Sequence, residues 1–231
     1  MFKIGDVISY LDMCREEGCN LQRGMNYRLR PGYSVILMSL RKGAPYVDRV
    51  EENGKVLIYE GHDIPKFRNS PDPKSVDQPR YQSRTKKPTQ NGHFCNAVER
   101  YRKNPLEIER VRVYEKIKSG IWVYNGLFLL DDYQQERSNG RKVFKFRLEM
   151  VDADTDIDET PDTLEHNRII PTQVKLEVWK RDKGQCIMCE SKDNLHFDHI
   201  LPYSKGGTSL KKENIQLLCV RHNLEKRDKI I

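Results

Sequence analysis

Residues 186–226 read CIMCESKDNLHFDHILPYSKGGTSLKKENIQLLCVRHNLEK, and this stretch decides the fold of the C-terminal part of the chain. It opens with Cys186 and Cys189 and carries Cys219 and His222 near its end. In each pair two residues separate the candidate ligands, a spacing at which two side chains can occupy two corners of a tetrahedron around Zn²⁺. The two pairs together therefore predict one structural Cys3His zinc site.

The segment between the ligand pairs predicts a strand, a turn, a second strand and a closing helix. Leu195, Phe197 and His199 alternate with polar residues, as in a short strand, and Pro202 with the glycines behind it breaks the pattern. QLLCVRHNLEKRDKI, residues 216–230, has the length and composition of a helix. Ahead of the first cysteine, QVKLEVWKRDKGQ predicts a short helix that stops at a glycine.

This C-terminal part closely resembles the HNH endonuclease family, a ββα-metal fold, through C-x2-C, D-H-I-x-P, G-G, N-I-Q-L-L-C and H-N-x-x-K in that order. The resemblance implies that Asp198 and Asn223 hold one divalent metal ion, Mg²⁺ or Mn²⁺. It also implies that His199 is the general base and that Asn214 fixes the loop that aims it. One departure concerns the zinc set, because the family often ends it with a second C-x2-C, whereas His222 takes the last place here.

These residue types suit the hydrolysis of a phosphodiester. A neutral imidazole with a pKa near 7, as expected for His199, can take a proton from the attacking water. A hard cation on the oxygens of Asp198 and Asn223 neutralises the scissile phosphate and the departing oxygen. A zinc module that only binds DNA stays open as an alternative, because spacing does not show activity.

The N-terminal part predicts a β-dominated domain. Its β-rich runs are SVILMSL, KVLIYEG, RVRVYEKI, IWVYNGLFLL and RKVFKFRLEMV. Helix is expected only in the first 20 residues and for a turn or two near FCNAVERYRK. This part contains no nuclease motif or phosphate-binding loop, so its role is expected to be recognition.

Residues 30–150 resemble the SRA (YDG) domain, a PUA-like β-barrel that reads modified cytosine. The likeness rests on SVILMS, VLIYEG, TQNGHFCNA, RVRVYEKI and LFLLDDYQQE, while Tyr-Asn-Gly at 124–126 departs from Tyr-Asp-Gly. It implies that a flipped cytosine is stacked between Tyr46 and Tyr59 and is read along its pairing edge by Asp48. The alternative is that both tyrosines are core or rim residues of the barrel.

Charge divides the chain into three segments. Residues 1–150 hold 28 Lys/Arg against 19 Asp/Glu, residues 151–173 hold 1 against 7, and residues 174–231 hold 12 against 8. We therefore expect a recognition domain at 1–150, an acidic linker at 151–173 and a nuclease domain at 174–231. The linker is either a solvated spacer or a strap that occupies a basic groove until DNA displaces it. Both basic bodies favour nucleic acid as the partner.

Targeting signals are missing from the sequence. It has no apolar run of 18 or more residues, and its first residues lack the features of a secretory signal. We expect a soluble, cytoplasmic protein of prokaryotic type with no membrane partner. In a reducing compartment the remaining cysteines, Cys14, Cys19 and Cys95, are interpreted as ordinary thiols.

Together these features predict an α+β protein with an SRA-like barrel and a small zinc-stapled ββα-metal domain. The predicted function is a modification-dependent DNA endonuclease that recognises 5-methylcytosine or 5-hydroxymethylcytosine in double-stranded DNA. One HNH site cuts one strand, so a double-strand break requires a homodimer or two events. Two alternatives are a nicking or structure-specific nuclease that ignores modification and a noncatalytic reader of modified DNA.

Overall fold

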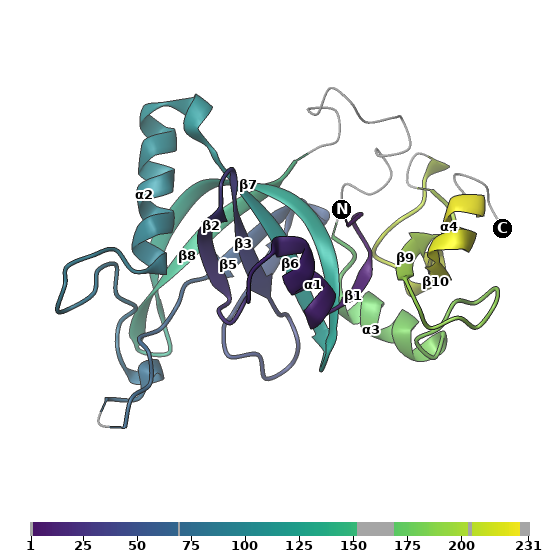
Figure 1. Ribbon diagram of the computed structural model, residues 1–231, viewed down its shortest axis with the longest axis horizontal. Coiled ribbons are helices and arrows are strands. Elements are labelled where there is room, and N and C mark those ends of the chain that lie inside the picture. The colour runs from purple at the N-terminus through teal and green to yellow at the C-terminus, as the bar shows by residue number, and fades with distance from the viewer. Residues whose placement is uncertain (1, 69, 152–168, 203–204, 227–231) are drawn as a thin grey trace.

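The N-terminal part of the protein is a mixed β-sheet with two helices (Figure 1). The computed structural model describes residues 2–68, 70–151, 169–202 and 205–226. Its N-terminal elements are β1 (Val7–Ser9), α1 (Tyr10–Glu17), β2 (Met25–Arg30), β3 (Tyr33–Met38), β4 (Arg49–Glu51), β5 (Val56–Glu60), α2 (Gln90–Lys103), β6 (Glu109–Lys118), β7 (Ile121–Ser138) and β8 (Arg141–Met150). The predicted α+β class and the β-dominated first domain are confirmed.

The sheet runs in the order β2-β3-β6-β7-β8-β5-β4, and β1 pairs with β7 outside this path. β3 and β6 are parallel, and the other neighbouring strands are antiparallel. The five predicted runs correspond to β3, β5, β6, β7 and β8. β7 reaches both neighbours because it is 18 residues long, pairing with β6 up to Leu130 and with β8 from Phe128 onward.

Helix α2 is longer than the turn or two that the sequence predicted. Thr89 caps its start by accepting a hydrogen bond from Gly92 N at 3.2 Å. Gly92 is a poor helix former, which hid this first turn from a sequence pattern. The structure requires it, since a Cβ at this position would lie 2.2 Å from the carbonyl oxygen of Arg80. Phe94 and Val98 then bury the inner face of the helix against the sheet.

The C-terminal unit consists of α3 (Thr172–Arg181), β9 (Leu195–His199), β10 (Ile215–Cys219) and α4 (Val220–Lys226). β9 and β10 form an antiparallel hairpin, and α4 follows β10 without a break. The predicted order of strand, turn, strand and helix is thus confirmed. None of the helices in the described ranges is both long and apolar enough to span a membrane.

The two units are joined by the N-terminal segment as well as by α3 (Figure 1). Gly5 N donates to Tyr124 O of β7 at 2.9 Å, and Phe197 N of β9 donates to Gly5 O at 3.1 Å. Strand β1 then continues along β7. The start of the chain therefore bridges the main sheet and the C-terminal hairpin.

Near its C-terminal end, the predicted linker includes residues that are buried or helical. Residues 152–168 lie outside the described residues. Ile169 is buried in the core of the main sheet, and Ile170 is buried in the core of the C-terminal unit. Thr172, assigned to the linker by the sequence, is the first residue of α3.

Candidate active site and zinc centre

The four predicted zinc ligands come together at one end of the β9–β10 hairpin. The ligand atoms of Cys186, Cys189, Cys219 and His222 all lie within 4.8 Å of one another. Cys189 Sγ is 3.8 Å from Cys219 Sγ, and His222 Nδ1 is 3.3 Å from Cys186 Sγ. Sulfur atoms bound at about 2.3 Å to one tetrahedral Zn²⁺ are separated by about 3.8 Å. The donor set and its spacing therefore fit a structural zinc.

The polypeptide around Cys186 favours the thiolate that a metal requires. Burial acts to raise the pKa of this thiol, but backbone N–H groups of Cys219, Met188 and Cys189 and the His222 side chain lower it to about 6. Ile187 N donates to Leu217 O at 3.0 Å, which ties the turn between the first two cysteines to β10. The zinc turn is thereby fixed to the strand that supplies the third cysteine.

The candidate catalytic residues Asp198 and His199 lie at the other end of the same hairpin, whereas Asn223 follows the zinc ligand His222 on α4. Cys219 is the register partner of Leu195, whereas Gln216 is opposite Asp198 and Ile215 is opposite His199. Asp198 and His199 are thus separated from Cys219 by most of the length of a five-residue strand. A zinc ion held by the cluster would stabilise the hairpin that presents them.

Asp198 is a buried carboxylate balanced by two neighbours. It is 5% exposed, and its Oδ2 accepts from Gln216 Nε2 at 3.0 Å and lies 3.0 Å from Lys226 Nζ. Among the described residues, no hydrogen bond joins it to Asn223, which stands three residues before Lys226 on α4. Residues three apart share a face of a helix. Asn223 and Lys226 are thus on the same side of α4.

His199 is covered by protein. Its ring is 4% exposed, and Nε2 lies 2.9 Å from the hydroxyl oxygen of Ser209. Burial lowers its pKa to about 4, an effect that His196 and Lys226 reinforce and Asp198 opposes. The pKa near 7 that the sequence led us to expect for His199 is therefore not found, because the ring is removed from water. The imidazole is neutral, which is the form that a general base needs.

Asn214 ties together the two ends of the turn that follows β9. Its Oδ1 accepts from Leu201 N at 2.7 Å, and its Nδ2 donates to Leu201 O at 2.9 Å and to Thr208 O at 3.1 Å. Ser209, next along the chain, is the residue that contacts His199. Asn214 therefore holds the loop against the imidazole.

Sequence reasoning missed three neighbours of the catalytic residues, namely Ser209, Gln216 and Lys226. Lys226 was present in the H-N-x-x-K motif, but only the structure shows that its Nζ donates to His199 O at 2.7 Å and pairs with Asp198. Gln216 could have been found from the hairpin register alone. Ser209 carried no signal in the sequence.

The candidate base pocket lies at the end of β5. Asp48 accepts hydrogen bonds from Glu60 N at 2.9 Å and from Ser39 N at 3.3 Å. Burial raises its pKa to about 7, although these two N–H groups lower it. The Tyr59 side chain is 1% exposed, and its hydroxyl pKa is raised by burial and then by the charges of Asp48 and Tyr46. The three predicted residues are therefore neighbours, and Tyr59 is a residue of the main core, which is the alternative that the sequence left open for it.

His62 is a further member of this group that the sequence did not single out. Its ring faces that of Tyr46 with centroids 6.1 Å apart and planes at 20°. Nε2 accepts from Met25 N at 2.8 Å, and burial lowers the pKa of His62 to about 4. Lys74 Nζ lies 4.0 Å from the centroid of the Tyr46 ring. A neutral imidazole and a cation thus both lie near the Tyr46 ring.

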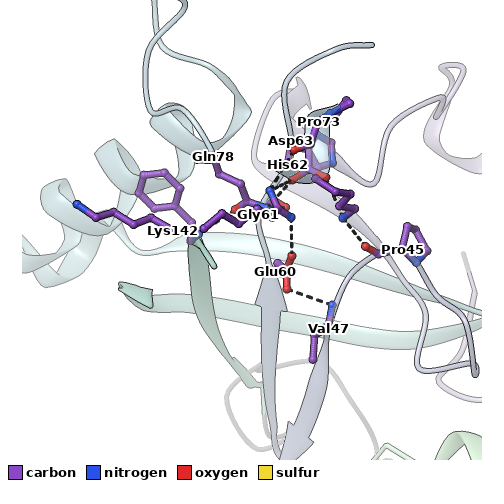
Figure 2. Close-up of polar contacts among 12 residues, drawn as sticks. Pro45, Val47, Glu60, Gly61, His62, Asp63, Pro73, Gln78 and Lys142 are labelled. Atoms are coloured by element: carbon purple, nitrogen blue, oxygen red, sulfur yellow. Dashed lines mark hydrogen bonds and ion pairs between the residues drawn. The ribbon is translucent and has the colours of Figure 1, made fainter. Parts of the chain in front are cut away.

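A buried ionic network fixes the loop that carries Tyr46 and Asp48 (Figure 2). Glu60 accepts from Val47 N at 3.2 Å and from Lys145 Nζ at 2.9 Å, and Lys145 Nζ also donates to Val47 O at 2.6 Å. Arg141 joins Glu60 to Asp63, which pairs with Lys74 at 2.8 Å. These contacts hold the pocket loop in place before any ligand binds.

Comparison with known proteins assigns the C-terminal unit. Residues 186–229 match the family model of the HNH endonucleases. This range contains the whole zinc set, Asp198, His199, Asn214 and Asn223.

The N-terminal part has relatives of another kind. The chain is 31% identical over 137 residues to the Arabidopsis thaliana histone-lysine N-methyltransferase, H3 lysine-9 specific SUVH5, covering 56% of this chain and 16% of that protein. It therefore spans about one sixth of the length of this curated relative. The structure is similar to the SUVH5 SRA domain in a hemi-methylated CG DNA complex, with 28% identity, 65% of this chain and 89% of that chain covered, and a TM-score of 0.43.

A third likeness extends over both units. The modification-dependent TagI restriction endonuclease is 20% identical, with 96% of this chain and 76% of that chain covered and a TM-score of 0.42. The matched family model, the Cys3His cluster and the ββα order agree for the C-terminal unit. The chain carries a C-terminal HNH endonuclease domain, which contains a Cys3His cluster that fits a structural zinc.

Proposed function

We propose that this protein is a modification-dependent DNA endonuclease. The N-terminal unit recognises a modified cytosine in double-stranded DNA, and the HNH domain hydrolyses the backbone nearby. The observation that carries the proposal is the presence, in one chain, of an HNH domain and a separate group of neighbouring side chains near β5, namely Tyr46, Asp48 and Tyr59. The resemblance of residues 30–150 to SRA domains supports the reading function.

The pocket chemistry suits a flipped base. Tyr46 offers an aromatic face, and stacking of one base on such a ring contributes about 1 to 3 kcal/mol. Unstacking a base costs a few kcal/mol, so the two terms are comparable. The Asp48 carboxylate accepts from the exocyclic amine of cytosine, and the modification is 5-methyl or 5-hydroxymethyl.

Asp198 and Asn223 form the proposed site for a catalytic cation, Mg²⁺ or Mn²⁺. A carboxylate and an amide oxygen are the hard ligands such ions prefer, and the ion neutralises charge on the scissile phosphate and the leaving oxygen. Lys226 Nζ, 3.0 Å from Asp198 Oδ2, supplies one positive charge at this carboxylate. This contact supports the proposal that a cation binds beside Asp198.

His199 is the proposed general base, and Asn214 positions it. For the imidazole to take a proton from water, its Nε2 must exchange the contact with Ser209 for one with that water. Hydrogen bonds of a catalytic group often rearrange when substrate binds. The three hydrogen bonds of Asn214 keep the turn and Ser209 in register during this exchange.

Matched plasmids that differ only in their modification test the proposal. The protein is incubated with Mg²⁺ or Mn²⁺ and plasmids that carry no mark, 5-methylcytosine, 5-hydroxymethylcytosine or N6-methyladenine. We expect cleavage of the cytosine-modified plasmids, and we expect His199→Ala to bind them without cutting. Equal cutting of every plasmid would show a nuclease that ignores modification. Selective binding without cleavage by the wild type would show a noncatalytic reader.

A further inference from the structure

The HNH domain packs against the N-terminal unit, the proposed reader of modified cytosine, through a buried polar cluster. Lys175 of α3 is 1% exposed, and its Nζ donates to Glu115 Oε2 of β6 at 2.5 Å and to Asn125 Oδ1 of β7 at 2.7 Å. Asn125 Nδ2 donates to the same carboxylate at 3.1 Å, and Thr172 Oγ1 donates to its other oxygen. The side chains come from both units, and they satisfy one another's hydrogen-bonding groups.

This cluster includes the position at which the chain departs from the Tyr-Asp-Gly signature. An aspartate at 125 would place a second carboxylate beside Glu115 with only one ammonium to balance both, a costly arrangement inside protein. The amide of Asn125 instead accepts from Lys175 and donates to Glu115. The departure from the signature is therefore explained by the contact with the nuclease unit.

Apolar packing and backbone pairing reinforce the polar contact. Ile117 and Val123 of the main sheet share one buried cluster with Val174 and Val178 of α3 and Phe197 of β9. The N-terminal segment is hydrogen-bonded to both units, as described above. Domains move relative to one another by default, unless a large apolar interface joins them. Here the core is continuous across the boundary.

The interface also reaches the proposed general base. A small cavity between the units is lined by Asn125 and Lys175 of the cluster together with Gly5, Phe197 and His199. Two of the side chains that hold the domains together and the imidazole thus line the same small cavity. A change in docking would move the walls around His199.

We infer that reader and nuclease act as one rigid body, locked by Lys175, Glu115 and Asn125, and that this lock fixes the position of the cut relative to the recognised base. The inference rests on the proposed function. A flexible tether would only raise the local concentration of DNA and would scatter the cuts. A rigid body brings the HNH site to one phosphate on the strand it reaches. Lys175 is in this sense a positioning residue.

The test maps cuts at nucleotide resolution on a duplex with a single central modified cytosine, using the full chain. Wild type is expected to give one dominant offset and one calorimetric unfolding transition. Lys175→Glu places a second carboxylate beside Glu115, and the two repel each other. We therefore expect a spread of cut positions and a separate unfolding transition of the HNH domain at lower temperature. Binding of the modified duplex should be retained. Lys180→Glu, an equal charge change at an exposed site on the same helix, is the control.

A charge swap separates loss of the lock from simple misfolding. Asn125 and Thr172 can each donate or accept, so Glu115→Lys combined with Lys175→Glu keeps every polar group in the cluster paired. We expect the double variant to regain the single offset and the single transition. The inference is wrong if wild type cuts modified DNA at scattered positions, or if Lys175→Glu keeps the wild-type offset. Failure of the proposed function looks different, since wild type would then show no preference for modified DNA.

Discussion

Lys226 Nζ lies 3.0 Å from Asp198 Oδ2, and both side chains are buried where α4 returns along the hairpin. Breaking a buried pair by removing one partner leaves an uncompensated charge. The ammonium therefore has two roles. It stabilises the hairpin, and it places a positive charge beside the carboxylate at the position where the proposed cation binds.

Lys226→Met is expected to destabilise the metal-free protein by about 3 kcal/mol, because it leaves Asp198 buried without its partner. If Asp198 is a metal ligand, added Mn²⁺ should raise the melting temperature of this variant more than that of wild type. Thermal unfolding with and without Mn²⁺ measures both effects. Lys212→Met, which removes an exposed ion pair with Glu177, is the control and should change little. An identical Mn²⁺ response in wild type and Lys226→Met would argue against Asp198 as a ligand.

Removal of zinc should unfold the HNH domain. Structural zinc sites contribute on the order of 10 kcal/mol of apparent binding free energy, which is a large share of the stability of so small a unit. We expect a strong chelator to release about one Zn²⁺ per chain, as expected for a single four-ligand structural site, and to abolish cleavage. Cys189→Ser should do the same, whereas Cys14→Ser, outside the cluster, should retain the metal. Metal analysis paired with near-ultraviolet circular dichroism follows both. Full zinc content in Cys189→Ser would contradict the assignment.

The sequence predicted the hairpin and its ligands well because local patterns specify them. C-x2-C, the alternation around Phe197 and the order of Asp198, His199 and Asn214 are all short-range features. The long strands β6 and β8 were equally visible, since each is a continuous β-rich run. The run at 121–130 predicted only the first part of β7, which continues through polar residues to Ser138. Strand β1 has three residues and depends on β7 for its existence, so no local pattern reveals it.

Contacts between distant segments could not be predicted in the same way. Lys175 is a charged residue on an amphipathic helix, and such residues are normally solvated. Only the fold brings it to Glu115, 60 positions earlier in the chain. The departure at Asn125 was apparent in the sequence, but its reason lies in the neighbouring unit. Likewise, the burial that lowers the pKa of His199 depends on packing and has no counterpart in the D-H-I motif.

Asn214→Ala should impair cleavage far more than DNA binding. The substitution removes three hydrogen bonds that close the turn between Leu201 and Thr208, and each contributes about 1 kcal/mol. A misplacement of the general base by about 1 Å can reduce the rate about 100-fold. We therefore expect a fall of that order in single-turnover cleavage with unchanged affinity for modified DNA. Lys211→Ala, at an exposed neighbour, should leave the rate unchanged. A wild-type rate for Asn214→Ala would show that the loop does not position His199.

Recognition of modified cytosine should weaken as the pH falls through about 7, because burial raises the pKa of Asp48 to about 7. Above this pH the group is a carboxylate and accepts from the cytosine amine. Below it, the group is protonated and one acceptor is lost. The quantity to measure is the ratio of affinities for modified and unmodified duplexes between pH 6 and pH 8, since the ratio cancels the general effect of pH on phosphate contacts. Asp48→Asn should lower this ratio at pH 8 and remove its dependence on pH. A ratio in wild type that is constant across the range would show that the ionised form of Asp48 does not read the base.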